Sequence, residues 1–161
     1  MMRWLTRQFA RGEPPLSEAT HRDAPAIAKL HASSFRRGWS DGEFERLLLE
    51  RNVVAHRAMI GGALGGFILS RLAAGEAEIL SVAVATPRRG RGLARALLNL
   101  HLRRLAGLGA RFVFLEVDQD NTAARRLYSR AGFQEVGRRE GYYQQAEGTG
   151  ATALVLRRDL T

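Results

Sequence analysis

Glycines and arginines alternate in one short segment, Arg89-Gly90-Arg91-Gly92-Leu93-Ala94, which follows an apolar run ending at Val84. If a helix begins in this segment, its first backbone N–H groups have no partner inside the helix and favour an anion there. The two glycines would let a phosphate come close to the backbone, and the arginines, together with Arg95, would add positive charge. The segment is therefore a candidate phosphate-binding loop. On the glycine spacing alone, an ordinary strand-to-helix turn with solvated arginines fits as well.

Two familiar phosphate-binding motifs do not match this segment. A dinucleotide-binding fingerprint needs Gly-x-Gly-x-x-Gly, and a Walker loop ends in Gly-Lys-Ser/Thr. The segment has neither pattern, so an anion bound here would belong to another class of ligand.

A glutamate interrupts the apolar run at 112–117. Because side chains alternate along a strand, Glu116 would lie on the same side as Phe112 and Phe114, where a hydrophobic residue is expected. Partial burial disfavours the charged form of a carboxyl group and makes it a usable general base near neutral pH. A glutamate at a strand end that faces water explains the pattern equally well.

A tyrosine lies on the apolar face of the helix that follows. Tyr128 comes two helical turns after Asn121, a residue type that can cap a helix. Its face is otherwise apolar, and the opposite face is basic. The apolar residues are Ala124, Leu127 and Ala131, and the basic ones are Arg125, Arg126 and Arg130. Most tyrosines in such a position are core residues.

The spacing of apolar residues predicts the elements that position these side chains. An extended piece at 16–19 precedes two helices, one that begins at Thr20 with Asp23 as its capping partner and one at Ser40 with Glu43. Strands are expected at 53–59, 66–71 and 78–84, joined by glycine turns in an antiparallel meander.

The second half predicts a strand–helix–strand unit. A helix at 92–108 and a strand at 112–117 should complete a right-handed parallel crossover. The helix after Asn121 should end in a left-handed cap at Gly132, and the last strands are expected at 133–138 and 152–156. With 161 residues, 45% of them hydrophobic, the chain suits a single domain at 14–161 after a basic extension at 1–13.

The run Val82-Ala83-Val84-x-x-Pro-x-Arg-Gly-x-Gly-Leu-Ala resembles motif A of the GCN5-related N-acetyltransferase family, whose hallmark is Arg/Gln-x-x-Gly-x-Gly/Ala. The resemblance implies an α/β (α+β) fold with a mixed sheet of about seven strands, four flanking helices and two splayed parallel strands. It also implies acetyl-CoA as cosubstrate. Its diphosphate would lie on the backbone of Arg89 to Ala94 beside Arg95, and its pantetheine arm would pair with Val82 to Val84.

A second run, Leu115-Glu116-Val117-x-x-x-Asn121 through Leu127-Tyr128 to Gly132-Phe133, is similar to the members of this family that acetylate the N-terminal alanine of ribosomal proteins. The resemblance covers about 16–156. It implies Glu116 as general base, Tyr128 as general acid and Asn121 as a coenzyme contact. Trp39, Tyr142 and Tyr143 would contact the acceptor peptide. Gly38 and Gln144 stand where those relatives usually have prolines.

Three functions remain open at this stage. The first is acetylation of a protein N-terminus by direct transfer, with main-chain N–H groups of Val82 to Val84 stabilising the oxyanion. The second is acetylation of a small amine such as an antibiotic or polyamine. The third is a basic RNA-associated binding module, suggested by a net charge of +9. The arginines are scattered in pairs without interleaved aromatic residues, which disfavours a nucleic acid as substrate.

The remaining composition excludes several kinds of site. No cysteine is present, so disulfides, thiolate zinc sites and a cysteine nucleophile are ruled out. The implied mechanism requires no metal, and the histidines are expected to be structural or solvated; they are His21, His31, His56 and His101. Residues 1–11 lack the apolar stretch of a signal peptide or membrane span. These observations lead us to expect a cytoplasmic monomer or weak dimer without a membrane partner.

Overall fold

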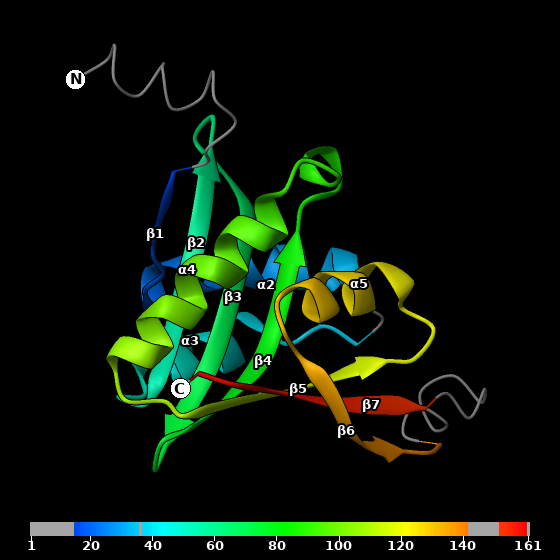
Figure 1. Ribbon diagram of the computed structural model, residues 1–161. Coiled ribbons are helices and arrows are strands. Elements are labelled where there is room, and N and C mark those ends of the chain that lie inside the picture. The colour runs from blue at the N-terminus through cyan, green and yellow to red at the C-terminus, as the bar shows by residue number, and fades with distance from the viewer. Residues whose placement is uncertain (1–14, 36, 142–151, 161) are drawn as a thin grey trace.

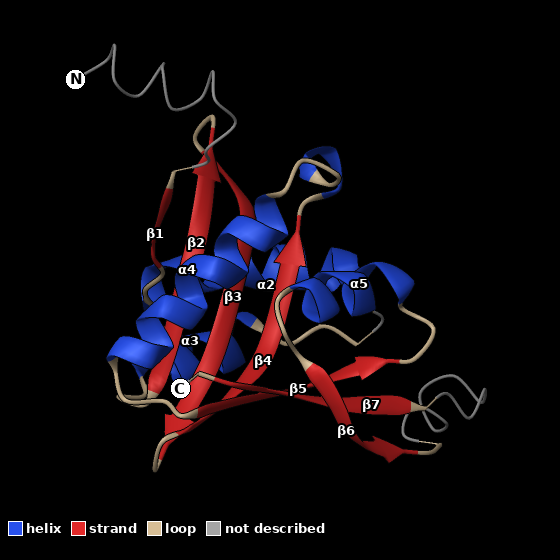
Figure 2. Cartoon of the chain, viewed as in Figure 1, coloured by secondary structure: helices blue, strands red, loops and turns tan. Residues whose placement is uncertain are grey.

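The computed structural model of the protein describes residues 15–35, 37–141 and 152–160. Within them a mixed sheet of seven strands separates two pairs of helices (Figures 1 and 2). The expected fold class is therefore confirmed. None of the helices in the described part of the chain has the length and apolar character needed to cross a membrane.

The sheet has the order β1-β2-β3-β4-β5-β7-β6. Its strands are β1 (Leu16–Glu18), β2 (Val53–Ile60), β3 (Ala63–Ala73), β4 (Glu76–Val84), β5 (Phe112–Asp118), β6 (Gln134–Arg139) and β7 (Ala153–Asp159). Neighbouring strands are antiparallel except β4 and β5, which are parallel. The predicted meander and the parallel crossover are both present.

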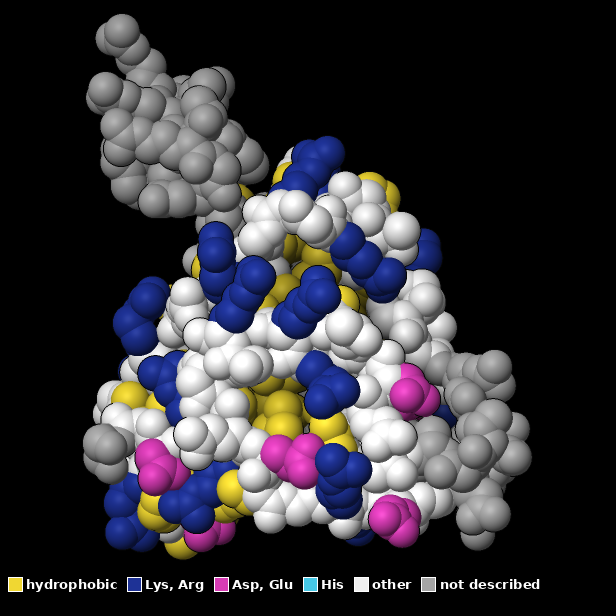
Figure 3. Space-filling model, turned by 45° about the vertical axis from the view of Figure 1, so that its right-hand side comes forward, with side chains coloured by type: hydrophobic (Ala, Val, Ile, Leu, Met, Phe, Trp, Pro, Cys, Tyr) yellow, Lys and Arg dark blue, Asp and Glu magenta, His cyan; other side chains and the backbone are white. Residues whose placement is uncertain are grey.

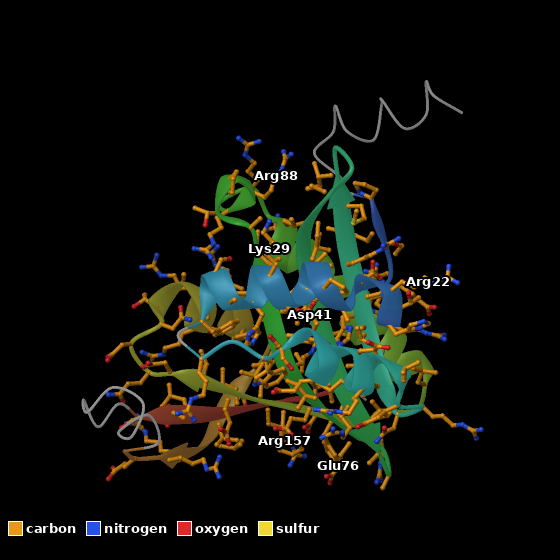
Figure 4. The ribbon with its side chains drawn as sticks, turned by 180° about the vertical axis from the view of Figure 1, so that it is seen from behind. Arg22, Lys29, Asp41, Glu76, Arg88 and Arg157 are labelled. Atoms are coloured by element: carbon orange, nitrogen blue, oxygen red, sulfur yellow. The ribbon has the colours of Figure 1, made fainter. Side chains whose placement is uncertain are left out.

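Four α-helices cover the two faces of the sheet. They are α2 (Ala24–Ser34), α3 (Asp41–Leu49), α4 (Leu93–Gly107) and α5 (Thr122–Arg130), with short 3-10 turns at η1 (His21–Asp23) and η2 (Thr86–Arg88). Figure 1 shows α4 in front of the sheet, and Figure 4 shows α2 and α3 on the opposite face. Each face has its own hydrophobic cluster, one beneath α4 and α5 and the other beneath α2 and α3.

Hydrogen bonds in the structure explain two of the predicted helix boundaries. The Thr20 hydroxyl accepts from the Arg22 amide, and the Thr20 amide donates to Asp23, although this capping box begins the 3-10 turn that leads into α2. Gly132 ends α5 with a φ of +88°, and the Phe133 amide donates to the Tyr128 carbonyl, which is a Schellman-type cap. Both signals were readable from residue type and spacing.

Three buried polar side chains form a hydrogen-bonded chain between α4 and the sheet. His56 Nδ1 lies 2.8 Å from His101 Nδ1, and His101 Nε2 lies 2.6 Å from Ser70 Oγ. Facing ring nitrogens need one donor and one acceptor, so at least one of them carries no proton. Burial, and then the neighbouring His56, lower the pKa of His101 to about 3, and burial lowers the pKa of His56. Both rings are therefore neutral at pH 7.

The free energy of unfolding should decrease in acid because of this network. Unfolded His101 binds a proton below about pH 6.5, whereas folded His101 stays neutral down to about pH 3. The contribution is therefore fully present above pH 6.5 and is lost as the pH falls through that window. For His101 alone the loss between pH 7.5 and pH 5 is about 2 kcal/mol.

Urea unfolding at these two pH values measures this loss. His101→Gln should reduce the pH dependence, and His21→Gln, at an exposed position, is the control that should leave it unchanged. An unaltered pH dependence in His101→Gln would contradict the assignment.

Candidate active site

Strands β4 and β5 pair over only three positions before they separate. The paired residues are Glu76 with Phe112, Ala77 with Val113 and Glu78 with Phe114. Beyond Glu78, the strand β4 continues to Val84 with no partner on the β5 side among the described residues, and Figure 1 shows the two strands diverging. The expected splay of the parallel strands is confirmed.

A β-bulge lies at the point where the strands part. In the register of β3 with β4, Ser70 pairs with Ile79 and Leu69 pairs with Ser81, so that Leu80 is the extra residue. A bulge bends its strand and increases the local twist. The bend comes directly after the last β4–β5 pair and turns β4 away from β5.

A cavity of about 860 Å³ lies beside the end of β4, on the side from which β5 has separated. Its walls come from the end of β4, the loop before α4, the first turns of α4, the inner face of α5 and the end of α2. The lining residues predicted from the sequence are Val82, Ala83, Val84, Arg89, Gly90, Gly92, Leu93, Ala94, Arg95, Asn121 and Tyr128. Arg91 and Glu116 were expected at the site but are not part of this lining.

The glycines of the loop have the conformations that the phosphate hypothesis requires. Gly90 and Gly92 have φ angles of +77° and +80°, a region that favours glycine. Gly92 is the N-cap residue of α4 and supplies no side-chain cap, so the first amides of the helix lack an internal partner. Arg89 Nε donates to the Val84 carbonyl at 3.0 Å, which fastens the loop to the end of β4.

The cavity is strongly basic. Five arginines line it, and none of its described lining residues is acidic; the arginines are Arg88, Arg89, Arg95, Arg126 and Arg130. Figure 3 shows dark blue side chains around hollows with hydrophobic floors on this side of the molecule. The cavity therefore combines an apolar interior with a positive rim, which suits a long ligand that ends in phosphates.

Tyr128 is both a core residue and a lining residue. Its ring lies 5.6 Å from the Phe133 ring in an edge-to-face contact, and the side chain is buried. Burial raises the pKa of the Tyr128 phenol above its usual range, so the hydroxyl keeps its proton. One turn before it, the Ala124 amide donates to Asn121 Oδ1 at 3.1 Å, so Asn121 caps α5 while it lines the cavity.

Glu116 lies on the opposite face of β5 from the residues that pack under α4 and α5. Val113, Leu115 and Val117 are buried there, whereas Glu116 alternates with them and is partly buried, with 27% of its side chain exposed. Its Oε1 accepts from Arg139 Nη1 at 2.7 Å. The carboxyl group is thus paired with Arg139, on the side of the sheet that α2 and α3 cover.

Trp39 is held at the start of α3 by an aromatic cluster. Its amide donates to His31 Nδ1 at 3.2 Å, and its ring stacks on that of His31 and contacts Phe44. Burial lowers the pKa of His31, which matches the acceptor role of Nδ1. The preceding Gly38 packs against α2, since a Cβ there would lie 3.1 Å from Ala32 Cα. Tyr142 and Tyr143 lie outside the described residues.

Several lining residues were not predicted from the sequence. Phe35 and Ser34 reach the cavity from the end of α2, and Asn99 lies one turn after Arg95 on α4. Arg126 and Arg130 flank the apolar face of α5, although the sequence pattern placed them on a solvated face. Their spacing of four residues was the available signal, because it puts both guanidinium groups on one edge of the helix.

Comparison with known proteins agrees with this geometry. The sequence model of the acetyltransferase (GNAT) family matches residues 24–133. The chain belongs to this family. The protein is therefore an N-acetyltransferase. The splayed strands β4 and β5 and the loop before α4 lie within the matched region.

Among GNAT relatives, N-alpha-acetyltransferase RimI of Mycobacterium tuberculosis is 37% identical over 146 residues, covering 87% of this chain and 89% of the relative. The ribosomal protein bS18-alanine N-acetyltransferase of Escherichia coli is 29% identical over 126 residues, covering 78% and 84%. The crystal structure of the Escherichia coli ribosomal-protein-S18-alanine N-acetyltransferase superposes with a TM-score of 0.84 at 24% identity, covering 91% of this chain and 94% of that one. The chain thus has the GNAT fold over nearly its whole length.

Proposed function

We propose that this protein transfers the acetyl group of acetyl-CoA to the N-terminal α-amino group of a protein, and that its acceptor is the N-terminal alanine of a ribosomal protein. The observation that carries the proposal is the basic cavity between the end of β4, α4 and α5, which Gly90, Gly92 and Tyr128 line. The names of the relatives that cover most of the chain support the acceptor.

The residues of the cavity fit acetyl-CoA in three respects. Residues 82–84 pair with β3 on one side, and their opposite edge, which lacks β5 as a partner, can form the strand-like hydrogen bonds that a pantetheine arm offers. The free amides at the start of α4 and the open space beside Gly90, where a Cβ would meet nothing within 4 Å, suit a diphosphate. The arginines offset the remaining phosphate charge.

The chemistry assigned to the chain is direct transfer. Glu116, through an intervening water, accepts a proton from the α-ammonium of the acceptor, whose ordinary pKa is about 7.7 to 8.0. The amine nitrogen then forms a bond to the thioester carbonyl carbon, and the carbon–sulfur bond breaks. Main-chain N–H groups at 82–84 stabilise the charge that develops on the carbonyl oxygen. Tyr128 donates its proton to the departing sulfur, the nitrogen loses its second proton to solvent, and Tyr128 regains a proton from solvent, which leaves an amide and free coenzyme A.

The catalytic assignment is tested by two nearly isosteric substitutions. Glu116→Gln should lower kcat by about 10²- to 10⁴-fold, because it removes the proton acceptor, and Tyr128→Phe should lower it by at least about tenfold through loss of the donor. Initial rates measured by mass spectrometry on an alanine-initiated peptide check both values. Wild-type turnover in either variant would remove that residue from the mechanism.

The role of the loop backbone is tested by a matched pair of glycines. Gly90 and Gly62 have φ angles of +77° and +80°, and a Cβ at either would meet no atom within 4 Å. Gly90→Ala and Gly62→Ala should therefore cost similar stability, about 1 kcal/mol each. Only Gly90→Ala should also weaken coenzyme A binding, by about tenfold or more in calorimetry. Equal affinities in the two variants would contradict a diphosphate site at the loop.

The acceptor class is tested by a panel of substrates. Peptides that differ only in their first residue should be acetylated at the α-amino group, with alanine preferred, and an alanine peptide blocked at its N-terminus should not react. Spermidine and an aminoglycoside are the competing acceptors. Higher kcat/KM for either of these than for the alanine peptide would favour a small-molecule acetyltransferase instead.

A further inference from the structure

Two adjacent arginines on β6 pair with carboxylates on opposite faces of the sheet. Arg138 Nε lies 3.0 Å from Glu135 Oε2, and Arg139 Nη1 lies 2.7 Å from Glu116 Oε1. Both arginine side chains are 54% exposed. The first pair joins residues of one strand, whereas the second reaches across β7 to the residue assigned as general base.

A β-bulge at Val136 sets this arrangement. In the register of β6 with β7, Glu135 pairs with Leu156 and Gly137 pairs with Val155, so that Val136 is the extra residue. Alternation would otherwise put Glu135 and Arg138 on opposite faces, and the extra residue brings them to the same face.

The same shift places Arg139 on the face of Glu116. Glu116 pairs with Val155, and Val155 pairs with Gly137, so these three residues share a face. Arg139 lies two residues after Gly137 on β6 and therefore points to that face as well. A strand without the bulge would direct Arg138 toward Glu116 in its place.

The ion pair contributes little to stability, which leaves orientation as its main effect. Exposed ion pairs are worth about 0 to 1 kcal/mol. A glutamate with 27% of its side chain exposed can adopt several rotamers, and a general base must lie within hydrogen-bond reach of the proton it removes. The guanidinium of Arg139 is always charged and holds Oε1 in place, so that Oε2 remains to accept the proton.

We propose that Arg139 is a positioning residue that fixes the Glu116 carboxylate for proton transfer, and that the bulge at Val136 exists to aim it. This inference rests on the proposed function, in which Glu116 is the base. In this role Arg139 affects kcat only by orienting the Glu116 carboxylate.

A double-mutant cycle tests this role. Arg139→Met should lower kcat by about tenfold or more, leave KM for acetyl-CoA within about twofold and leave the melting temperature nearly unchanged. Arg139→Lys should restore most of the lost kcat, since a single charged donor suffices for Oε1. Arg138→Met, in the equally exposed neighbour, is the control and should retain wild-type kcat. In the Glu116→Gln background, Arg139→Met should cause no further loss.

The outcomes separate the two claims. If Glu116→Gln shows the expected loss of kcat while Arg139→Met keeps wild-type kcat, the positioning role is overturned and the assignment of Glu116 as base stands. The same fold-loss from Arg139→Met in both backgrounds would also overturn it, because Arg139 would then act independently of Glu116. Wild-type kcat in Glu116→Gln would instead overturn the base itself.

Discussion

The loss of pairing between β4 and β5 is the constraint on which the rest of the molecule depends. Three paired positions join the two halves of the sheet, and the bulge at Leu80 then turns β4 aside. Backbone groups on this edge of β4 must be satisfied by a group other than β5, which is why the gap suits the extended ligand proposed above. Because α4 follows β4 and α5 follows β5, both helices must border the gap. Three of the five lining arginines and the buried Tyr128 come from these two helices, and the other two arginines come from the segment before α4.

The proposed general acid and general base lie on opposite sides of β5. Tyr128 lies on the side of α4 and α5, inside the cavity, where burial keeps its phenol protonated. Glu116 lies on the other side, near the surface, where it pairs with Arg139. If the acid and the base were in contact, they would exchange a proton with each other and not with the substrate. The sheet instead keeps Tyr128 and Glu116 in separate environments. On this account the acceptor amine approaches from the side of α2 and α3, and the thioester lies within the gap.

Local patterns in the sequence were enough to predict most of the fold. The alternation in 53–84, the caps at Thr20, Asn121 and Gly132 and the strand-helix-strand unit all depend on residues close together in the chain. The glycine–arginine loop was found for the same reason. Family resemblance supplied the splay, because the bulge at Leu80 carries no glycine or proline that would mark it.

What the sequence could not predict depends on register between distant strands. The Glu116–Arg139 pair spans 23 residues and requires the extra residue at Val136. Arg126 and Arg130 look solvated on an isolated helix and become lining residues only when α5 packs beside the gap. The His56–His101 contact likewise joins residues 45 apart. In each case the residue types indicated the chemistry, but only the tertiary structure determines which residues are in contact.

The central claim, that acetyl-CoA binds to the edge of β4 that faces the gap and to the loop before α4, is tested most directly by amide hydrogen exchange with and without coenzyme A. Binding in the gap predicts slower exchange in 80–84 and 90–95, and no change in the β2–β3 turn at Gly61 and Gly62. Saturating coenzyme A that left exchange in 80–84 and 90–95 unchanged would contradict the account.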